Sequence, residues 1–165
     1  MNELFASTLA RLLAEVVSFK YVAQASHWNV RGINFQQFHE LFQEIYEDAE
    51  GSVDALGENL RKINYQTPST LVELLSLVEQ PAIVDATEPV ALSANLYQMN
   101  EYIRECLIGA MIVADEAGEQ GIYNFLADRF DKHSKWQWQL RMVIGDGIAD
   151  TYAIDVKAVT DSFLG

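Results

Sequence analysis

Apolar residues recur every three or four positions along four long stretches of the chain, which is the spacing of amphipathic helices. These stretches cover about residues 2–30, 35–63, 93–117 and 122–144. A shorter apolar stretch over 70–78 predicts one more helix, and no stretch has the period of two that is typical of strands. We therefore expect an all-α protein.

The breaks between these stretches contain residues that end helices. Residues 31–34 include a glycine, residues 81–89 are bounded by two prolines, and residues 118–121 are bounded by two glycines. Ser93 is expected to be the N-cap of the third long helix. These features predict a four-helix bundle with a short extra helix in the connection between the second and third long helices, in a single domain over 1–165.

The composition favours cations over anionic partners. The net charge is -13, with 24 acidic and 11 basic residues, so the surface repels phosphate backbones and anionic membranes. Cys106 is the single cysteine, which excludes an internal disulfide and a cysteine-rich cluster built by one chain. No stretch approaches the ~18 consecutive apolar residues of a membrane span. We expect a cytoplasmic protein with no membrane association.

The stretch over 26–60 joins two histidines to a series of carboxylates. Imidazole and carboxylate groups together suit iron, manganese and zinc. Diiron sites inside helical bundles use Glu-x-x-His on two helices. The residues three positions before the histidines of this chain are Gln24, Gln36 and Phe130, so we do not expect such a site in the core of one chain.

Spacing along the second long stretch predicts a site shared between chains. At about 100° per residue, His39, Gln43, Asp54 and Glu58 share one stripe of a helix. His39 and Asp54 are nevertheless about 22 Å apart along the axis. Two antiparallel copies related by a twofold axis would bring the histidine end of one helix to the carboxylate end of the other, and His27 can approach the same place. Taken singly, a histidine on such a helix is more often a hydrogen-bonded structural residue, and a pair of acidic residues one turn apart usually belongs to a solvated face.

The residues S-H-W-N-V-R-G-x-N-F-x-x-x-H-E, followed by Asp54 and Glu58, resemble the Dps family of ferritin-like mini-ferritins. The segment D-E-A-G-E-x-G also resembles the turn before the last helix of that family, and H-S-K-W-Q-W resembles the body of that helix. The resemblance implies a ferritin-like bundle and a hollow homododecamer of twofold dimers, which oxidises Fe(II) with hydrogen peroxide or oxygen, stores ferric mineral and protects against oxidative damage. It also implies two-iron centres between subunits, in which His27 meets Asp54 and Glu58 of the partner subunit at the first iron site and His39 serves the second.

One position departs from the family pattern. Gln43 stands where the family has an aspartate of the second iron site, and a neutral amide oxygen binds a divalent cation more weakly than a carboxylate. Glu47, one turn further on, is a candidate to compensate. By position, Asp115 and Glu119 match the acidic pores of the family. Trp28 matches a tryptophan near the centre, which intercepts oxidising equivalents or packs at the subunit contact.

Two alternative functions stay open. The first is a Dps-like shell with a degenerate centre, which binds zinc or another divalent ion without efficient oxidation of iron. The second is a DNA-binding nucleoid protein, which is disfavoured because residues 146–165 hold one basic residue, Lys157, against four aspartates. The carboxylates expected on the inner wall of the shell, where mineral would nucleate, are Glu44, Glu47, Asp48 and Glu50.

Overall fold

The computed structural model describes residues 2–80, 83–152 and 155–164. Its four long helices are α1 (Asn2–Asn29), α2 (Phe35–Lys62), α4 (Pro89–Glu116) and α5 (Gln120–Ile144). The shorter elements are α3 (Leu71–Leu75), α6 (Asp146–Ala149), the 3-10 turn η1 (Asp150–Tyr152) and α7 (Val156–Leu164). These described residues contain no strand, and none of their helices is long and apolar enough to cross a membrane. The expected all-α fold, with a short helix between the second and third long helices, is confirmed.

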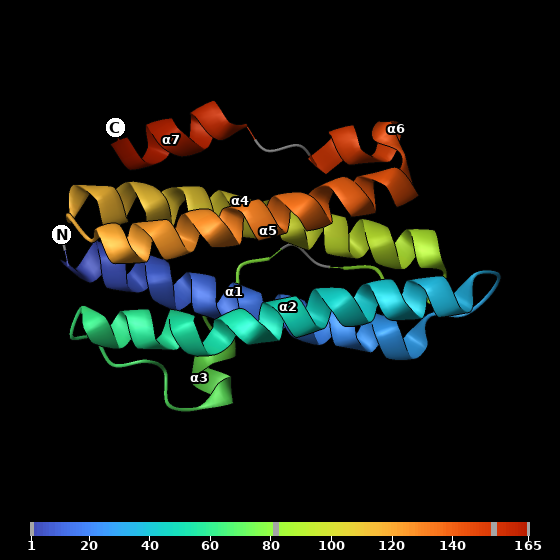
Figure 1. Cartoon of the computed structure of the whole chain (residues 1–165), viewed down its shortest axis with the longest axis horizontal. Helices are drawn as coiled ribbons and strands as arrows, with labels where there is room; N and C mark the ends of the chain where they lie inside the picture. Colours follow the sequence, from blue (N-terminus) through green and yellow to red (C-terminus); the bar gives the residue numbers. More distant parts are fainter. Residues whose placement is uncertain (1, 81–82, 153–154, 165) are drawn as a thin grey trace.

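The long helices form two antiparallel pairs, α1 with α2 and α4 with α5, which pack face to face (Figure 1). Helices α2 and α4 run in the same direction, so the connection between them returns along the length of the bundle. Helix α3 packs against α1 on one side, while α6 and α7 lie beyond the α4–α5 pair. The contact between the two pairs is uneven, because α1 packs closely on α4 whereas α2 and α5 have only a sparse interface.

The core lies between the pairs and is built from the apolar stripe of each long helix. In α2 the buried residues recur every three or four positions, through Phe42, Ile45, Ala49 and Leu56, as an amphipathic helix requires. Full burial of each large apolar side chain contributes about 1.5–3 kcal/mol. Because this stripe faces inward, the opposite face of α2, which carries the candidate ligands, points out of the bundle.

The tight turn between α1 and α2 places the start of α2 beside the end of α1. Gly32 has φ 111° and Asn34 has φ 65°, which are left-handed conformations that glycine and asparagine adopt at low cost. The backbone N–H of Arg31 donates to the Thr87 carbonyl at 3.1 Å, which ties the turn to the α3–α4 connection. This reversal brings together residues that are twelve positions apart in the sequence.

The expected start of the third long helix is wrong. Helix α4 begins at Pro89, and Ser93 is fully buried one turn inside it. Proline is favoured at the first helical position, where its missing N–H removes no helical hydrogen bond. Pro81 lies outside the described residues.

The spacing of apolar residues predicts no helix after residue 144. The chain nevertheless forms α7 there, which packs on α4. Phe163 of α7 lies over Gly109 of α4, where a Cβ atom would overlap the ring. Glycine at this position therefore permits the close approach of the two helices.

Candidate metal centre

His27, near the end of α1, and His39, in the second turn of α2, form a stacked pair. Their ring centroids are 3.6 Å apart at an interplanar angle of 16°. The Nδ1 of each ring lies 2.7 Å from the backbone oxygen of the other residue. A carbonyl oxygen only accepts, so each Nδ1 carries a proton, and in the neutral form of each ring Nε2 keeps the lone pair that can bind a metal. Histidines that bind metals are held in this way, with the second nitrogen donating to a carbonyl or carboxylate.

Aromatic residues hold the pair from several sides. Phe35 stacks on the His39 ring at 4.9 Å, and Tyr46 meets the His27 ring edge-on at 5.4 Å. Both histidines are half-buried, so solvent ions can still reach them. Trp28 is 58% exposed and packs edge-on against Tyr21 at 6.4 Å. Its expected place beside a metal centre stays a prediction.

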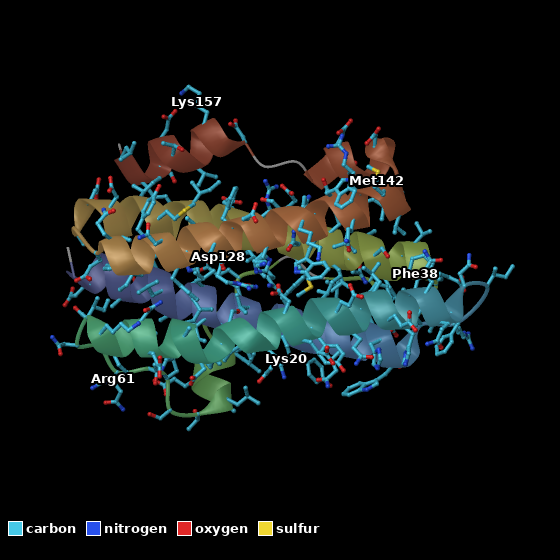
Figure 2. The ribbon with its side chains drawn as sticks, viewed as in Figure 1. Lys20, Phe38, Arg61, Asp128, Met142 and Lys157 are labelled. Atoms are coloured by element: carbon cyan, nitrogen blue, oxygen red, sulfur yellow. The ribbon has the colours of Figure 1, made fainter. Side chains whose placement is uncertain are left out.

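The two carboxylate candidates lie far from this pair. Asp54 and Glu58 are exposed in the second half of α2, which is one continuous helix, so Asp54 stands about 22 Å along the axis from His39. Figure 2 labels Phe38 and Arg61, which mark the two ends of α2 and lie toward opposite ends of the molecule. Among the described residues, no three histidine, cysteine or acidic side chains come together in a group that could hold a metal ion. One chain therefore presents two separate halves of the predicted ligand set.

Gln43 links the histidine half to an additional carboxylate. Its Nε2 donates to Glu47 Oε1 at 2.8 Å, one turn further along α2. Gln43 is half-buried and Glu47 is exposed. The amide of Gln43 thus holds the carboxylate of Glu47 beside the stripe of candidate ligands.

The other predicted acidic residues have different surroundings. Asp115 and Glu119 are exposed around the turn between α4 and α5, where Gln120 Nε2 donates to Asp115 Oδ1 at 3.2 Å. Glu44 is exposed on α2. Glu50 forms an ion pair with Lys20 of α1 at 2.9 Å. The assignment of these carboxylates to a pore or an inner wall stays a prediction.

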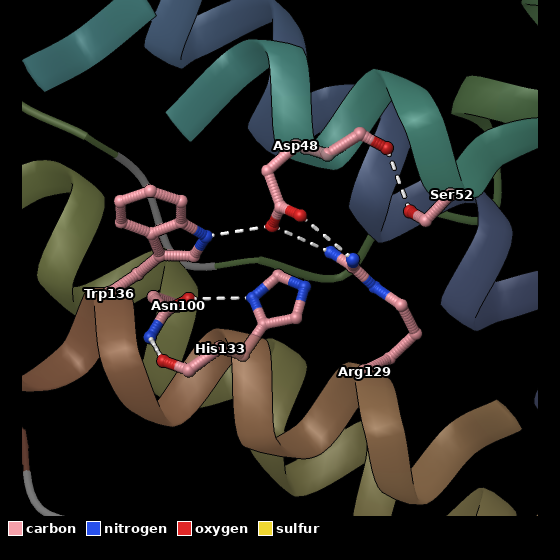
Figure 3. Close-up of polar contacts among 7 residues, drawn as sticks. Asp48, Ser52, Asn100, Arg129, His133 and Trp136 are labelled. Carbon is pink, nitrogen blue, oxygen red and sulfur yellow. Dashed lines mark hydrogen bonds and ion pairs between the residues drawn. The ribbon is translucent and has the colours of Figure 1, made fainter. Parts of the chain in front are cut away.

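The assignment of Asp48 to the inner wall also stays a prediction, and within one chain its side chain contacts α5. Its carboxylate accepts hydrogen bonds from Arg129 Nη1 at 3.0 Å, Arg129 Nη2 at 2.9 Å and Trp136 Nε1 at 2.7 Å (Figure 3). These bonds hold the pKa of Asp48 below its ordinary value, against the opposing effect of burial. Sequence reasoning missed this cluster, although Arg129 and Trp136 are seven residues apart and so share one face of α5.

The third histidine, His133, has a structural role in the core. Its ring is 1% exposed, and its Nδ1 lies 2.7 Å from Asn100 Oδ1. Asn100 Nδ2 donates to the His133 carbonyl at 2.9 Å (Figure 3). It also donates to Gln137 Oε1 at 2.7 Å. Burial, together with the charge of Arg129, lowers the pKa of His133 to about 3. The ring is therefore neutral near pH 7, and its Nδ1 donates to Asn100.

Comparison with known proteins identifies the same bundle. A family model for the ferritin-like domain matches residues 6–147. The DNA protection during starvation protein of Brevibacillus brevis is 29% identical over 132 residues, which cover 79% of this chain and 85% of that protein. The crystal structure of a Dps protein from Bacillus brevis superposes with a TM-score of 0.81 at 26% identity, over 87% of this chain and 97% of that one. A Dps protein from Vibrio cholerae O1, described as a member of a broad superfamily of ferritin-like diiron-carboxylate proteins, superposes with a TM-score of 0.82 at 22% identity, over 87% and 91% of the two chains.

Proposed function

The chain belongs to the Dps family of ferritin-like proteins, and on that premise we propose that it oxidises Fe(II) and stores the ferric product inside a hollow dodecamer. Iron binding and storage are the family-level function of these diiron-carboxylate proteins. The observation that carries the proposal is the reciprocal pair of His27 and His39, in which each Nδ1 contacts a backbone carbonyl and each Nε2 is the ring nitrogen left to bind an ion. The cytoplasm is the proposed location.

The centres lie between twofold-related subunits. Each chain offers nitrogen ligands at one end of α2 and the carboxylates of Asp54 and Glu58 at the other, about 22 Å apart by the rise of a helix. A twofold axis near the middle of α2 would put the histidines of one subunit opposite the carboxylates of the partner at both ends. Pairing of subunits therefore completes two equivalent sites at once.

The proposed chemistry needs ligands that bind Fe(II) and stabilise Fe(III). Two ferrous ions each give up one electron, and one hydrogen peroxide molecule takes up both electrons and two protons to become two water molecules. The Nε2 atoms of His27 and His39 bind the incoming ions, and Asp54 and Glu58 balance the increase in positive charge. Gln43 supplies no charge, so the second iron site is expected to be the weaker of the two, with Glu47, the carboxylate that Gln43 contacts, as the candidate to compensate.

A second candidate function is a shell that binds zinc or another divalent ion without efficient oxidation of iron. The neutral side chain of Gln43, at a position where the family has an aspartate, is the observation that favours it. Its histidine and carboxylate ligands would be the same, because imidazole and carboxylate groups suit zinc as well as iron.

The test is the initial rate of Fe(II) oxidation, followed optically with peroxide and with oxygen. Asp54→Ala is expected to slow oxidation at least about 100-fold, since loss of a direct ligand exceeds the 10–100-fold effect of outer-shell partners. Asp161→Ala is the control, because it removes an exposed carboxylate from α7, outside the ferritin-like match. An unchanged rate in Asp54→Ala would exclude the proposed ligand set, and a wild type that oxidises Fe(II) no faster than the protein-free buffer would favour the inactive shell. The mass of the assembly in solution tests the dodecamer.

A further inference from the structure

Asp48 fastens the middle of α2 to α5. Its carboxylate accepts three hydrogen bonds, two from the fork of Arg129 and one from the indole of Trp136. The side chain of Arg129 is 9% exposed and that of Asp48 is 22% exposed. A bidentate ion pair at this depth is fixed in direction and only weakly screened by solvent.

This cluster compensates for the sparse interface between the two helices. Along most of its length α2 packs on α1 rather than on α5. Arg129 and Trp136 hold the Asp48 carboxylate from positions that are seven residues, or about two turns, apart on α5 (Figure 3). The cluster thus restrains both the rotation of α2 about its axis and its distance from α5.

The restraint acts at a position that matters for the ligands. On a helix with about 100° per residue, His39, Gln43, Asp54 and Glu58 lie about 80° to 180° around the axis from Asp48, all in the same direction. Asp48 is nine residues from His39 and six from Asp54, or about 13 Å and 9 Å along the axis. It therefore sits between the two halves of the proposed centre, on the side that faces the bundle.

A small rotation of α2 would misplace both halves together. Side-chain atoms stand about 5–6 Å from the axis of a helix, so a rotation of about 10° moves them by about 1 Å. A displacement of this size can slow a reaction about 100-fold. The ligand set is divided between two subunits, so a rotation of both copies of α2 would displace both the histidine ligands and the carboxylate ligands of each centre.

We propose that Asp48, held by Arg129 and Trp136, is a positioning residue that sets the orientation of α2 for the proposed iron centre. The inference rests on the proposed function, because it concerns the same ligands. In this proposal a half-buried aspartate that is not itself a ligand controls how the histidine half and the carboxylate half of the centre meet.

The test compares Asp48→Asn with Trp136→Phe, which removes only the indole donor and keeps an aromatic ring. Two measurements are made on the assembled protein: the initial rate of Fe(II) oxidation, and the ligand-field absorption of Co(II) bound at saturation. Asp48→Asn is expected to slow oxidation about tenfold to 100-fold and to change the Co(II) bands. Trp136→Phe is expected to slow it about threefold, because the ion pair remains.

Asp146→Asn is the matched control, because it makes the same substitution in an exposed aspartate–arginine pair, with Arg141 of α5. It is expected to leave both readouts unchanged. Circular dichroism and assembly mass establish that the variants fold, and if Asp48→Asn does not fold, Trp136→Phe decides the question.

A folded Asp48→Asn, or in its place Trp136→Phe, with wild-type rate and wild-type Co(II) bands overturns the positioning role. So does a variant that only loses thermal stability while its Co(II) bands stay the same. A wild type that neither oxidises iron nor binds Co(II) excludes the proposed function and the positioning role together. A wild type that does both, with unaffected variants, excludes the positioning role alone.

Discussion

The chain holds its three histidines in two contrasting environments. His27 and His39 are half-buried where α1 meets α2, and each uses Nδ1 to bind a backbone carbonyl of the other. His133 also donates through Nδ1, but its partner is a buried asparagine and its ring is 1% exposed. The difference lies in access, because an ion from solvent can reach the first two rings and cannot reach the third. Hydrogen bonds alone therefore do not separate a ligand from a structural histidine.

The largest expected effects come from replacing one histidine of each kind and comparing the stability and the metal binding of the two variants. His133→Ala is expected to lower the free energy of unfolding by about 3 kcal/mol, since it leaves a cavity and an unpaired Asn100. His27→Ala is expected to lower it by no more than about 1 kcal/mol, as for a half-exposed residue, yet to abolish tight Co(II) binding. Denaturant unfolding and Co(II) titration of both variants provide the measurements.

His133→Gln is the control for the first variant, because it keeps a side-chain amide that can donate to Asn100. The contrast would fail if His133→Ala, while still folded and assembled, lost Co(II) binding as His27→Ala does. It would also fail if His27→Ala bound Co(II) as tightly as the wild type.

The meeting of His27 and His39 was accessible to sequence reasoning because it depends on local structure. The two residues flank one short turn, and a helix that ends before Gly32 must reverse there. The number and type of the long helices were predictable for the same reason, since periodicity reports on each helix separately. The start of α4 was not, because the N-cap signal of Ser93 competes with a proline that begins the helix one turn earlier.

The features that the sequence did not reveal depend on contacts between distant residues. Asp48 and Arg129 are 81 positions apart, and their pairing becomes predictable only once the rotation of α2 relative to α5 is known. Gly109 and Phe163 meet for a similar reason, through packing of α7 on α4. Asp48 lies among several acidic residues of α2, and nothing in the sequence distinguishes it as the one whose side chain faces α5. The sequence therefore identified candidate ligands more readily than it identified what orients them.

A second test concerns pH, because two buried groups titrate in opposite senses. The pKa of His133 is lowered to about 3 from an ordinary value of 6.5, chiefly by burial, so its contribution to stability is complete above pH 6.5 and is lost as the pH falls. Burial raises the pKa of Glu15 from 4.5 to about 7, assisted by the nearby Glu79 carboxylate. The contribution of Glu15 is therefore complete below pH 4.5 and is lost as the pH rises toward 7.

These two contributions oppose each other between about pH 4.5 and 6.5. Each is worth at most about 1.4 kcal/mol per pH unit, so together they give the wild type a shallow dependence of stability on pH. Glu15→Gln removes one of them and is expected to steepen the dependence, with stability falling as the pH drops from 6.5 to 4.5. Urea unfolding at pH 5, 6 and 7 measures the slopes.

The control for this experiment is Glu79→Gln, which neutralises the adjacent carboxylate while Glu15 stays in place. Its side chain is 54% exposed, so its own effect on the slope is expected to be smaller. Equal slopes in the wild type and in Glu15→Gln would show that the buried carboxyl does not titrate in this range, and the opposition between the two groups would be refuted.

The smallest expected effect is on the rate of Fe(II) oxidation when Gln43, one turn after His39 on α2, is replaced. Gln43→Asp supplies the carboxylate that the family has at this position, and it is expected to accelerate Fe(II) oxidation about threefold to tenfold, because an anionic oxygen binds a divalent cation more tightly than an amide does. The gain is limited, since the substitution also removes the hydrogen bond from Gln43 to Glu47 and places two carboxylates one turn apart until a cation binds.

Gln43→Asn separates these effects, because asparagine has the length of aspartate without the charge, and this variant is expected to oxidise Fe(II) no faster than the wild type. Equal rates in all three proteins would mean that Glu47 already supplies the charge at the second site, and that the amide at position 43 is no handicap.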